Sequence, residues 1–143
     1  MVSLKGKKVY LDANTLIYAL EGVPQFSNLK SGLLALLQAR ELTITTSALT
    51  LLEVIVYPRR NGDLAGEQKF RSFLTPSDSM RIVPIDDGIL ERAADLRARH
   101  VSFRTPDAIH LATGIAAQCD LFLTADLAWS KAGVVVIDPA EVG

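Results

Sequence analysis

The sequence predicts an α/β fold, a three-layer α/β/α sandwich built around a mostly parallel central sheet. Short segments rich in β-branched and aromatic residues alternate along the chain with longer segments whose apolar residues recur every three or four positions. This alternation is typical of parallel strands joined by helices that cover both faces of the sheet. The chain has 143 residues and no internal repeat, low-complexity tract or linker, so we expect residues 1–143 to form a single domain.

The expected strands are five short apolar segments. They span residues 8–12, 42–46, 80–85, 121–124 and 134–137. The first combines β-branched and aromatic side chains in the manner of a buried strand. In a parallel sheet the carboxyl ends of the strands lie at one edge, and ligands bind at that edge in this class of fold.

Six helices are expected between these strands. The first follows Asn14, which is a suitable N-cap, and runs to residue 22. The third begins at Ser47 and ends before Pro58, because proline disfavours a helical conformation in the residue that precedes it. The other four are predicted near residues 29–37, 64–74, 87–100 and 105–118.

Composition limits the classes of function. The net charge is −1, so the chain as a whole is not an electrostatic surface for nucleic acid, and a polyanion would have to be held by a local basic patch. The single cysteine, Cys119, excludes an internal disulfide and suits a reducing compartment. No apolar run approaches the ~20 residues of a membrane span, and no signal-peptide cleavage site is evident. We therefore expect a cytoplasmic protein with no membrane contact.

Four acidic residues stand where a predicted strand or loop meets a predicted helix. Asp12 closes the first strand and Asp126 follows the fourth, while Glu53 and Asp107 lie near the starts of helices. Two carboxylates ~4 Å apart repel by about 4 kcal/mol at an effective dielectric constant of 20. Four at one edge of a sheet would need neutralisation, for which oxygen-ligated Mg²⁺ or Mn²⁺ is suited. The pattern predicts a metal-dependent active site.

Asp12 and Glu53 also have structural interpretations. Asp12 could cap the following helix, although Asn14 is expected to be better placed for that role. Glu53 would complete a capping box if the helix began at Thr50. If the helix begins at Ser47, Glu53 lies deeper in an apolar stretch and needs a partner. Spacing alone does not separate these two interpretations of Glu53.

The other two acids have structural interpretations of the same kind. Asp107 would be a favourable first-turn residue if Thr105 were the N-cap and Pro106 the first helical residue. Asp126 could cap a short segment over residues 127–130. Each acid alone is weak support for a site, and their joint placement at element junctions is what indicates one.

Four stretches of sequence together resemble the PIN-domain family, particularly the VapC-type toxins. They cover residues 9–18, 46–54, 104–113 and 123–126, and the third contains the fairly specific Thr-Pro-Asp-Ala-Ile-His-Leu-Ala. The family comprises Mg²⁺- or Mn²⁺-dependent ribonucleases that are commonly dimeric, and its toxin members are blocked by a partner antitoxin. One difference is Ala125, where many relatives have asparagine.

The resemblance implies roles for residues at matching positions. Asp12, Glu53 and Asp107 would be the core metal ligands, and Asp126 would complete the acidic quartet through water or a second ion. Asn14 and Thr124 would not bind the metal directly but would orient its ligands or water. By this resemblance, the protein would be an Mg²⁺- or Mn²⁺-dependent endoribonuclease and the toxin of a type II toxin–antitoxin pair. It would act on RNA as a homodimer, with a cognate antitoxin as its partner.

Three further residues are singled out near these motifs. Arg104 is a candidate phosphate contact, although a solvated surface arginine is an equal alternative. His110 is expected to be a packed, hydrogen-bonded histidine rather than a catalytic base, and Trp129 to cover the end of the sheet.

Two other functions stay open at this point. One is a non-catalytic RNA-binding or regulatory module. The other is a metal-dependent phosphatase, suggested by a loose similarity of residues 12–15 to an Asp-x-Asp-x-Thr loop whose second acid is missing here.

Overall fold

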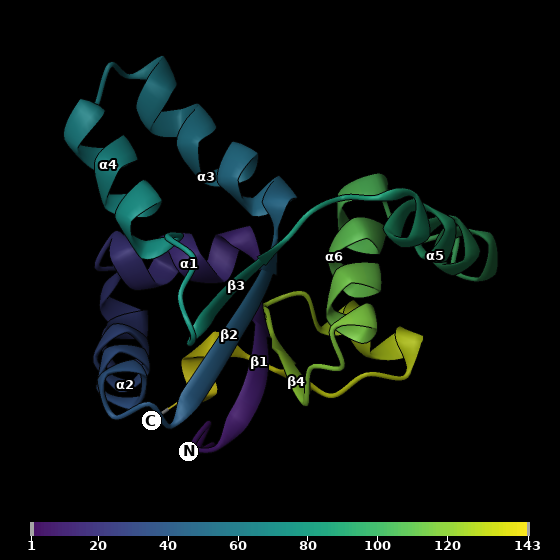
Figure 1. The fold of residues 1–143 in the computed structure, drawn as a ribbon, viewed down its shortest axis with the longest axis horizontal. Helices are drawn as coiled ribbons and strands as arrows, with labels where there is room; N and C mark the ends of the chain where they lie inside the picture. The colour runs from purple at the N-terminus through teal and green to yellow at the C-terminus, as the bar shows by residue number, and fades with distance from the viewer. Residues whose placement is uncertain (1, 143) are drawn as a thin grey trace.

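The computed structural model describes residues 2–142 and contains a five-stranded sheet in the order β3-β2-β1-β4-β5 (Figure 1). Every neighbouring pair of strands is parallel. The strands are β1 (Lys7–Leu11), β2 (Leu42–Ser47), β3 (Met80–Val83), β4 (Leu121–Leu123) and β5 (Val136–Ile137). All five overlap the segments predicted from the sequence, and the predicted parallel sheet with helices on both faces is confirmed.

The helices alternate with the strands as predicted. They are α1 (Ala13–Leu20), α2 (Ser27–Gln38), α3 (Ala48–Arg60), α4 (Leu64–Phe73), α5 (Asp87–Arg99) and α6 (Thr105–Ala116), with 3-10 helices at η1 (Pro24–Phe26), η2 (Leu127–Ala132) and η3 (Pro139–Glu141). Within residues 2–142, no helix combines the length and apolar character needed to cross a membrane.

The two faces of the sheet are covered by different helices because side chains alternate along each strand. In β1, Val9 and Leu11 pack into a core with residues of α1 and α2. Tyr10 points to the opposite face and packs with α5, α6 and the Phe122 side chain of β4. This alternation produces the three layers, and it directs the Tyr10 side chain toward α6.

Helix α3 continues past the point where the sequence predicts its end. Pro58 lies inside the helix, which runs on to Arg60, so the prediction that it ends before Pro58 is wrong. The last turn is supported from outside, because Arg59 donates to Glu67 of α4 at 2.9 Å and 3.1 Å. Tertiary contacts with α4 therefore offset the local cost of a proline in a helix.

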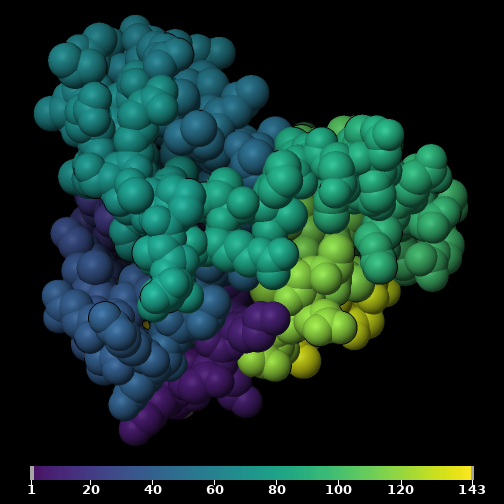
Figure 2. Space-filling view, viewed as in Figure 1, coloured from purple at the N-terminus to yellow at the C-terminus, as the bar shows by residue number. Residues whose placement is uncertain are grey.

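Helices α3 and α4 form a hairpin that stands away from the sheet (Figure 1). In the space-filling view this hairpin forms a lobe of its own, and the surface dips between it and the lobe made by α5 and α6 (Figure 2). The base of the hairpin packs on α1 through a third apolar cluster that includes Leu16, Val54 and Phe70. Both lobes contribute a helix start to the same edge of the sheet.

Helix α6 approaches the sheet closely at Gly114. A Cβ atom at this position would overlap the Phe122 ring and would lie 3.1 Å from Cδ2 of Tyr10. Only a glycine lets the helix backbone lie this near to β1 and β4.

Candidate active site

The register of the sheet brings the first predicted acid beside the end of β4. Leu11 and Leu123 are register partners in the parallel pair β1–β4. The next residues, Asp12 and Thr124, therefore leave the sheet side by side, and Thr124 Oγ1 donates to Asp12 Oδ2 at 2.7 Å. Adjacent strand ends thus hold the first acid in place.

Asp12 is the N-cap of α1, and Asn14 is not. The Asp12 side chain accepts from the Thr15 backbone N–H at 2.8 Å, whereas Asn14 is an exposed residue of the first turn, so the prediction of Asn14 as the cap is wrong. Asp12 is only 7% exposed. Its two hydrogen bonds and its place at a helix N-terminus stabilise the buried charge. Each oxygen retains a lone pair, so capping does not prevent Asp12 from binding a ligand.

Glu53 lies in the second turn of α3, because Ser47 caps that helix by accepting from the Leu49 backbone N–H at 3.0 Å. A capping box with Thr50 is thereby excluded. Glu53 has the partner that its apolar surroundings require, since its Oε1 lies 2.6 Å from Nε2 of His110. Its side chain is 29% exposed, against 4% for His110.

His110 is buried between β1 and α3, as a packed and hydrogen-bonded residue. Its Nδ1 lies 2.6 Å from the Tyr10 hydroxyl, opposite the contact of Nε2 with Glu53. Burial raises the pKa of the Tyr10 phenol well above its ordinary value, so Tyr10 keeps its proton. The ring of His110 also stacks on Trp129, with centroids 5.9 Å apart.

Asp107 is the third residue of α6, whose N-cap is Arg104 and not the predicted Thr105. One oxygen of Asp107 accepts from the Arg104 backbone N–H at 3.0 Å, and the other lies 3.4 Å from Nε1 of Trp129. Trp129 is buried at the end of the sheet, where the sequence predicts it. Asp107 is therefore fixed by a backbone N–H and one indole N–H.

Asp126 and the polar candidates around it lie further out. Asp126 is exposed and caps η2 by accepting from the Ala128 backbone N–H at 3.2 Å. Its own backbone N–H donates to Thr124 Oγ1 at 3.1 Å, which connects it to the residue that holds Asp12. Ala125 and Arg104 are also exposed, and the Arg104 side chain stands beside the start of α6.

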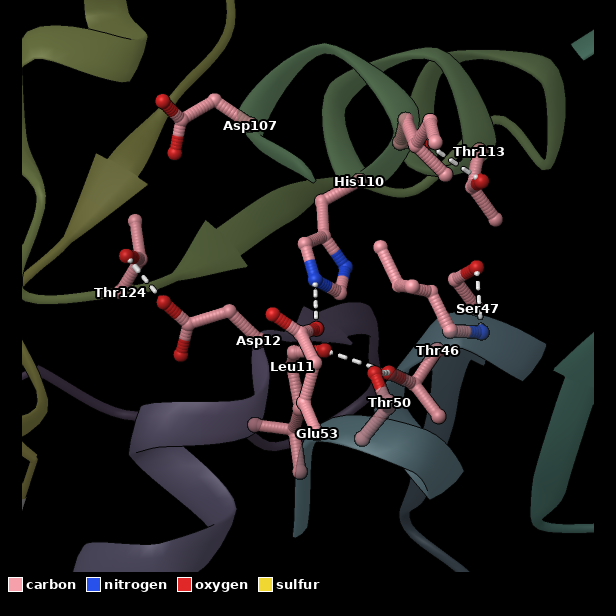
Figure 3. Close-up of polar contacts among 12 residues, drawn as sticks. Leu11, Asp12, Thr46, Ser47, Thr50, Glu53, Asp107, His110, Thr113 and Thr124 are labelled. Carbon is pink, nitrogen blue, oxygen red and sulfur yellow. Dashed lines mark hydrogen bonds and ion pairs between the residues drawn. The ribbon is translucent and has the colours of Figure 1, made fainter. Parts of the chain in front are cut away.

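Figure 3 shows how the acids are oriented. Asp12 and Asp107 point toward the side on which Thr124 lies, whereas the Glu53 carboxyl group points to His110. No lysine or arginine in the described part of the chain forms an ion pair with any of the four acids. The donors that hold these carboxylates are hydroxyl, backbone, indole and imidazole groups.

Comparison with known proteins identifies the family. The sequence model of the PIN domain matches residues 9–135. The chain belongs to the PIN-domain family. No curated protein matches the sequence.

Several solved structures of toxins and toxin–antitoxin complexes share this fold. A toxin–antitoxin complex from Klebsiella pneumoniae is 26% identical, with a TM-score of 0.67 over 92% of this chain and 97% of that chain. VapBC2 from Rickettsia felis, bound to a DNA fragment from its promoter, is 17% identical, with a TM-score of 0.69 over 91% and 97%. The sarcin–ricin-loop-cleaving toxin VapC20 from Mycobacterium tuberculosis is 21% identical, with a TM-score of 0.67 over 89% and 96%.

PIN-domain nucleases generally use a divalent metal ion. The donor chemistry of this site suits one, because Asp12, Glu53 and Asp107 offer carboxylate oxygens, the ligands preferred by hard cations. Oε2 of Glu53 has no hydrogen-bond partner among residues 2–142. As the side chains stand, no three His, Cys, Asp or Glu residues in that range are close enough to hold one ion. A shared ion would require at least one of the three to turn.

Two contacts of this PIN site were not predicted from the sequence. The link from Glu53 to His110 joins residues 57 positions apart, and Tyr10 completes it from β1. One signal was present: His110 follows Asp107 by three positions, a spacing that places both on one side of a helix. The partner of His110 could not be found in this way, because it depends on how α3 and α6 pack.

Proposed function

We propose that this PIN domain is an Mg²⁺- or Mn²⁺-dependent endoribonuclease that hydrolyses RNA phosphodiester bonds. Its metal ligands would be Asp12, Glu53, Asp107 and Asp126. One observation carries the proposal: these acids lie near one edge of the sheet, and none forms an ion pair with a lysine or arginine in the described chain. Carboxylates along one edge without cationic partners would suit a divalent cation once at least one side chain turns to share it.

Neighbouring residues hold three of the acids along this edge of the sheet. Thr15 and Thr124 hold Asp12, His110 holds Glu53, and the Arg104 backbone with Trp129 holds Asp107. When bound, Mg²⁺ or Mn²⁺ supplies the positive charge that offsets the developing charge on a phosphodiester and makes water nucleophilic at neutral pH.

We assign two supporting roles near the acids. Asn14 is exposed one residue beyond the Asp12–Ala13 turn and would orient water or ligands together with Thr124. Arg104 would contact a phosphate of the RNA, because its exposed side chain stands at the start of α6 beside Asp107.

Cleavage of a labelled pool of single-stranded RNA by the purified protein tests the proposal. We expect cutting with Mg²⁺ or Mn²⁺ and none with EDTA. Asp12→Asn should lose more than roughly 100-fold in cleavage, because removing even a residue that only supports a metal ligand costs about 10- to 100-fold in activity. Asparagine keeps the oxygen that caps α1, so the far-ultraviolet circular dichroism of the variant should match that of the wild type.

Other outcomes of this assay have clear meanings. Equal cutting by Asp12→Asn, or cutting that persists in EDTA, would contradict the proposed centre. RNA binding with no cutting in either metal would support the non-catalytic RNA-binding module instead. Release of phosphate from a small phosphoester with no effect on RNA would support a phosphatase.

We also propose that the nuclease is the toxin of a toxin–antitoxin pair. The shared fold with the toxin–antitoxin complexes supports this, and so does an apolar groove of about 260 Å³ between α1, α3 and α4. Its lining includes Ile17, Val54, Tyr57 and Phe70, which could receive an apolar antitoxin segment. If a small open reading frame lies beside the gene, its purified product should inhibit cleavage, and undiminished cleavage in a stoichiometric mixture would count against that product as the antitoxin. The expected homodimer stays a prediction, which light scattering would check.

A further inference from the structure

We infer that His110 is a positioning residue that orients Glu53 for metal binding, with Tyr10 fixing the tautomer of the His110 ring. The inference rests on the proposed function, because it assigns to Glu53 the role of a metal ligand. Three side chains carry it, in a line that runs from β1 through α6 to α3, and His110 occupies the middle of that line.

The first step is the direction of the two hydrogen bonds. An ionised carboxylate only accepts, so Nε2 of His110 must donate its hydrogen to Glu53 Oε1 across the observed 2.6 Å. In the tautomer with its one ring hydrogen on Nε2, Nδ1 is an acceptor. The Tyr10 hydroxyl, 2.6 Å away, can then donate to Nδ1. Because burial keeps the phenol protonated, Tyr10 is suited to be that donor.

The second step is the rigidity of the donor. His110 and Tyr10 are both buried, and the His110 ring is also held by stacking against Trp129. By contrast, the Glu53 side chain is partly exposed on α3. A long, partly exposed side chain samples several rotamers unless a fixed partner holds it, so His110 determines where the Glu53 carboxyl group lies.

The third step is that this contact leaves Glu53 free to bind. Only Oε1 is engaged by His110, and Oε2 has no hydrogen-bond partner among residues 2–142. One oxygen can therefore be anchored while the other meets a cation. Hydrogen-bonded carboxylate ligands of this kind typically lose about 10- to 100-fold in metal affinity when the outer partner is removed.

Two amide variants of His110 form a matched pair for the test. In His110→Gln the side-chain nitrogen reaches about as far as Nε2, so the donor to Glu53 is kept. In His110→Asn the amide reaches only the level of Nδ1, so the donor to Glu53 is lost. Both variants place a neutral amide in the same buried position, which makes each a control for the stability of the other.

The principal readout is the affinity for Mn²⁺, measured by electron paramagnetic resonance of the free ion and independent of RNA cleavage. We expect His110→Asn to bind Mn²⁺ about 10- to 100-fold more weakly than the wild type, and His110→Gln to restore most of the affinity. In a Glu53→Gln background, the two His110 variants should no longer differ. A general effect on folding would persist in that background.

The tautomer is measured on the wild-type protein by ¹⁵N-histidine nuclear magnetic resonance, which needs no folded variant. The chain has two histidines, and the spectrum of His110→Gln assigns the signals. We expect His110 to carry its hydrogen on Nε2, and Tyr10→Phe to allow exchange with the other tautomer. A proton on Nδ1 alone in the wild type would overturn the inference.

The remaining outcomes separate this inference from the proposed function. Equal Mn²⁺ affinity in the wild type and His110→Asn, or tighter binding by His110→Asn, would overturn the positioning role and leave a nuclease intact. A wild-type protein that neither binds Mn²⁺ nor cleaves RNA would overturn the proposed function, and this inference with it.

Discussion

Two glutamates on neighbouring helices are held in different ways. Glu67 of α4 is bound by two arginines, Arg59 and Arg71, each with a nitrogen 2.9 Å from one of its oxygens. These hydrogen bonds lower the pKa of Glu67 to about 2. Among residues 2–142, Glu53 of α3 is bound only by His110, and no lysine or arginine pairs with it. The first carboxylate is neutralised by arginines within the chain, and the second is oriented by a histidine with no lysine or arginine of the described chain beside it.

The contrast distinguishes a structural carboxylate from a candidate functional one. At the α3–α4 hairpin, charged partners cancel the charge of Glu67 and fix the last turn of α3 against α4. At the sheet edge, the acids receive hydrogen bonds from Thr124, Trp129 and backbone N–H groups, none of which is cationic. Such donors hold a carboxylate in place without removing its affinity for an external cation.

The largest expected effect is on RNA cleavage by one glutamine substitution in each region. Glu53→Gln should reduce cleavage by more than roughly 100-fold, because it removes the charge of a proposed metal ligand while keeping an oxygen for His110. Glu67→Gln should leave cleavage within a few-fold of the wild type, because Glu67 lies on α4 and contacts two arginines and none of the four acids. Single-turnover cleavage of the same RNA by both variants measures the difference.

Two results would contradict the separate roles of these glutamates. Full activity in Glu53→Gln would remove Glu53 from the proposed site. If Glu67→Gln lost as much cleavage as Glu53→Gln while remaining folded at the assay temperature, Glu67 itself would have a part in cleavage that its contacts do not indicate.

A smaller effect is expected on thermal stability, with the order of the two variants reversed. Glu67→Gln should lower the melting temperature at pH 7 by a few degrees, because two arginines lose their charged partner. Glu53→Gln should not lower it, since neutralisation relieves repulsion among the acids and preserves the contact with His110.

The pH dependence of that difference provides the sharpest check. The folded-state pKa of Glu67 is about 2, below its ordinary value of 4.5, so its stabilising contribution is complete above pH 4.5. The contribution is lost as the pH falls toward 2, where protonated Glu67 resembles glutamine. The gap in melting temperature between the wild type and Glu67→Gln should therefore close over this range. A gap that is constant from pH 7 to pH 2 would mean that the ion pairs do not produce it.

The sheet was predictable because a strand buried on both faces needs an uninterrupted apolar segment, as in Val9-Tyr10-Leu11. Helix ends were less predictable. The strand β1 ends where its pairing with β4 ends, after Leu11, and this places Asp12 rather than Asn14 at the start of α1. Helix α3 continues past Pro58 because α4 supports its last turn. Both outcomes depend on contacts between segments distant in sequence.

The positions of the four acids followed from topology, since parallel strand ends and helix starts share one edge of the sheet. Their partners did not follow. Thr124 reaches Asp12 across 112 positions and His110 reaches Glu53 across 57, and no local pattern encodes either distance. The sequence also left two interpretations of Glu53 open, and the N-cap at Ser47 decides between them.

Gly114 determines how closely helix α6 packs on the sheet, and this distance affects the site. His110 lies four residues before Gly114, about one turn away on the same helix, so any outward shift of α6 would be passed on to the 2.6 Å contact with Glu53. A hydrogen bond accepts a stretch of only about 0.5 Å before it weakens. The clearance between helix and sheet is set by the lack of a methyl group beside Phe122 and Tyr10. Gly114, which contacts none of the acids, thus controls how precisely Glu53 is positioned.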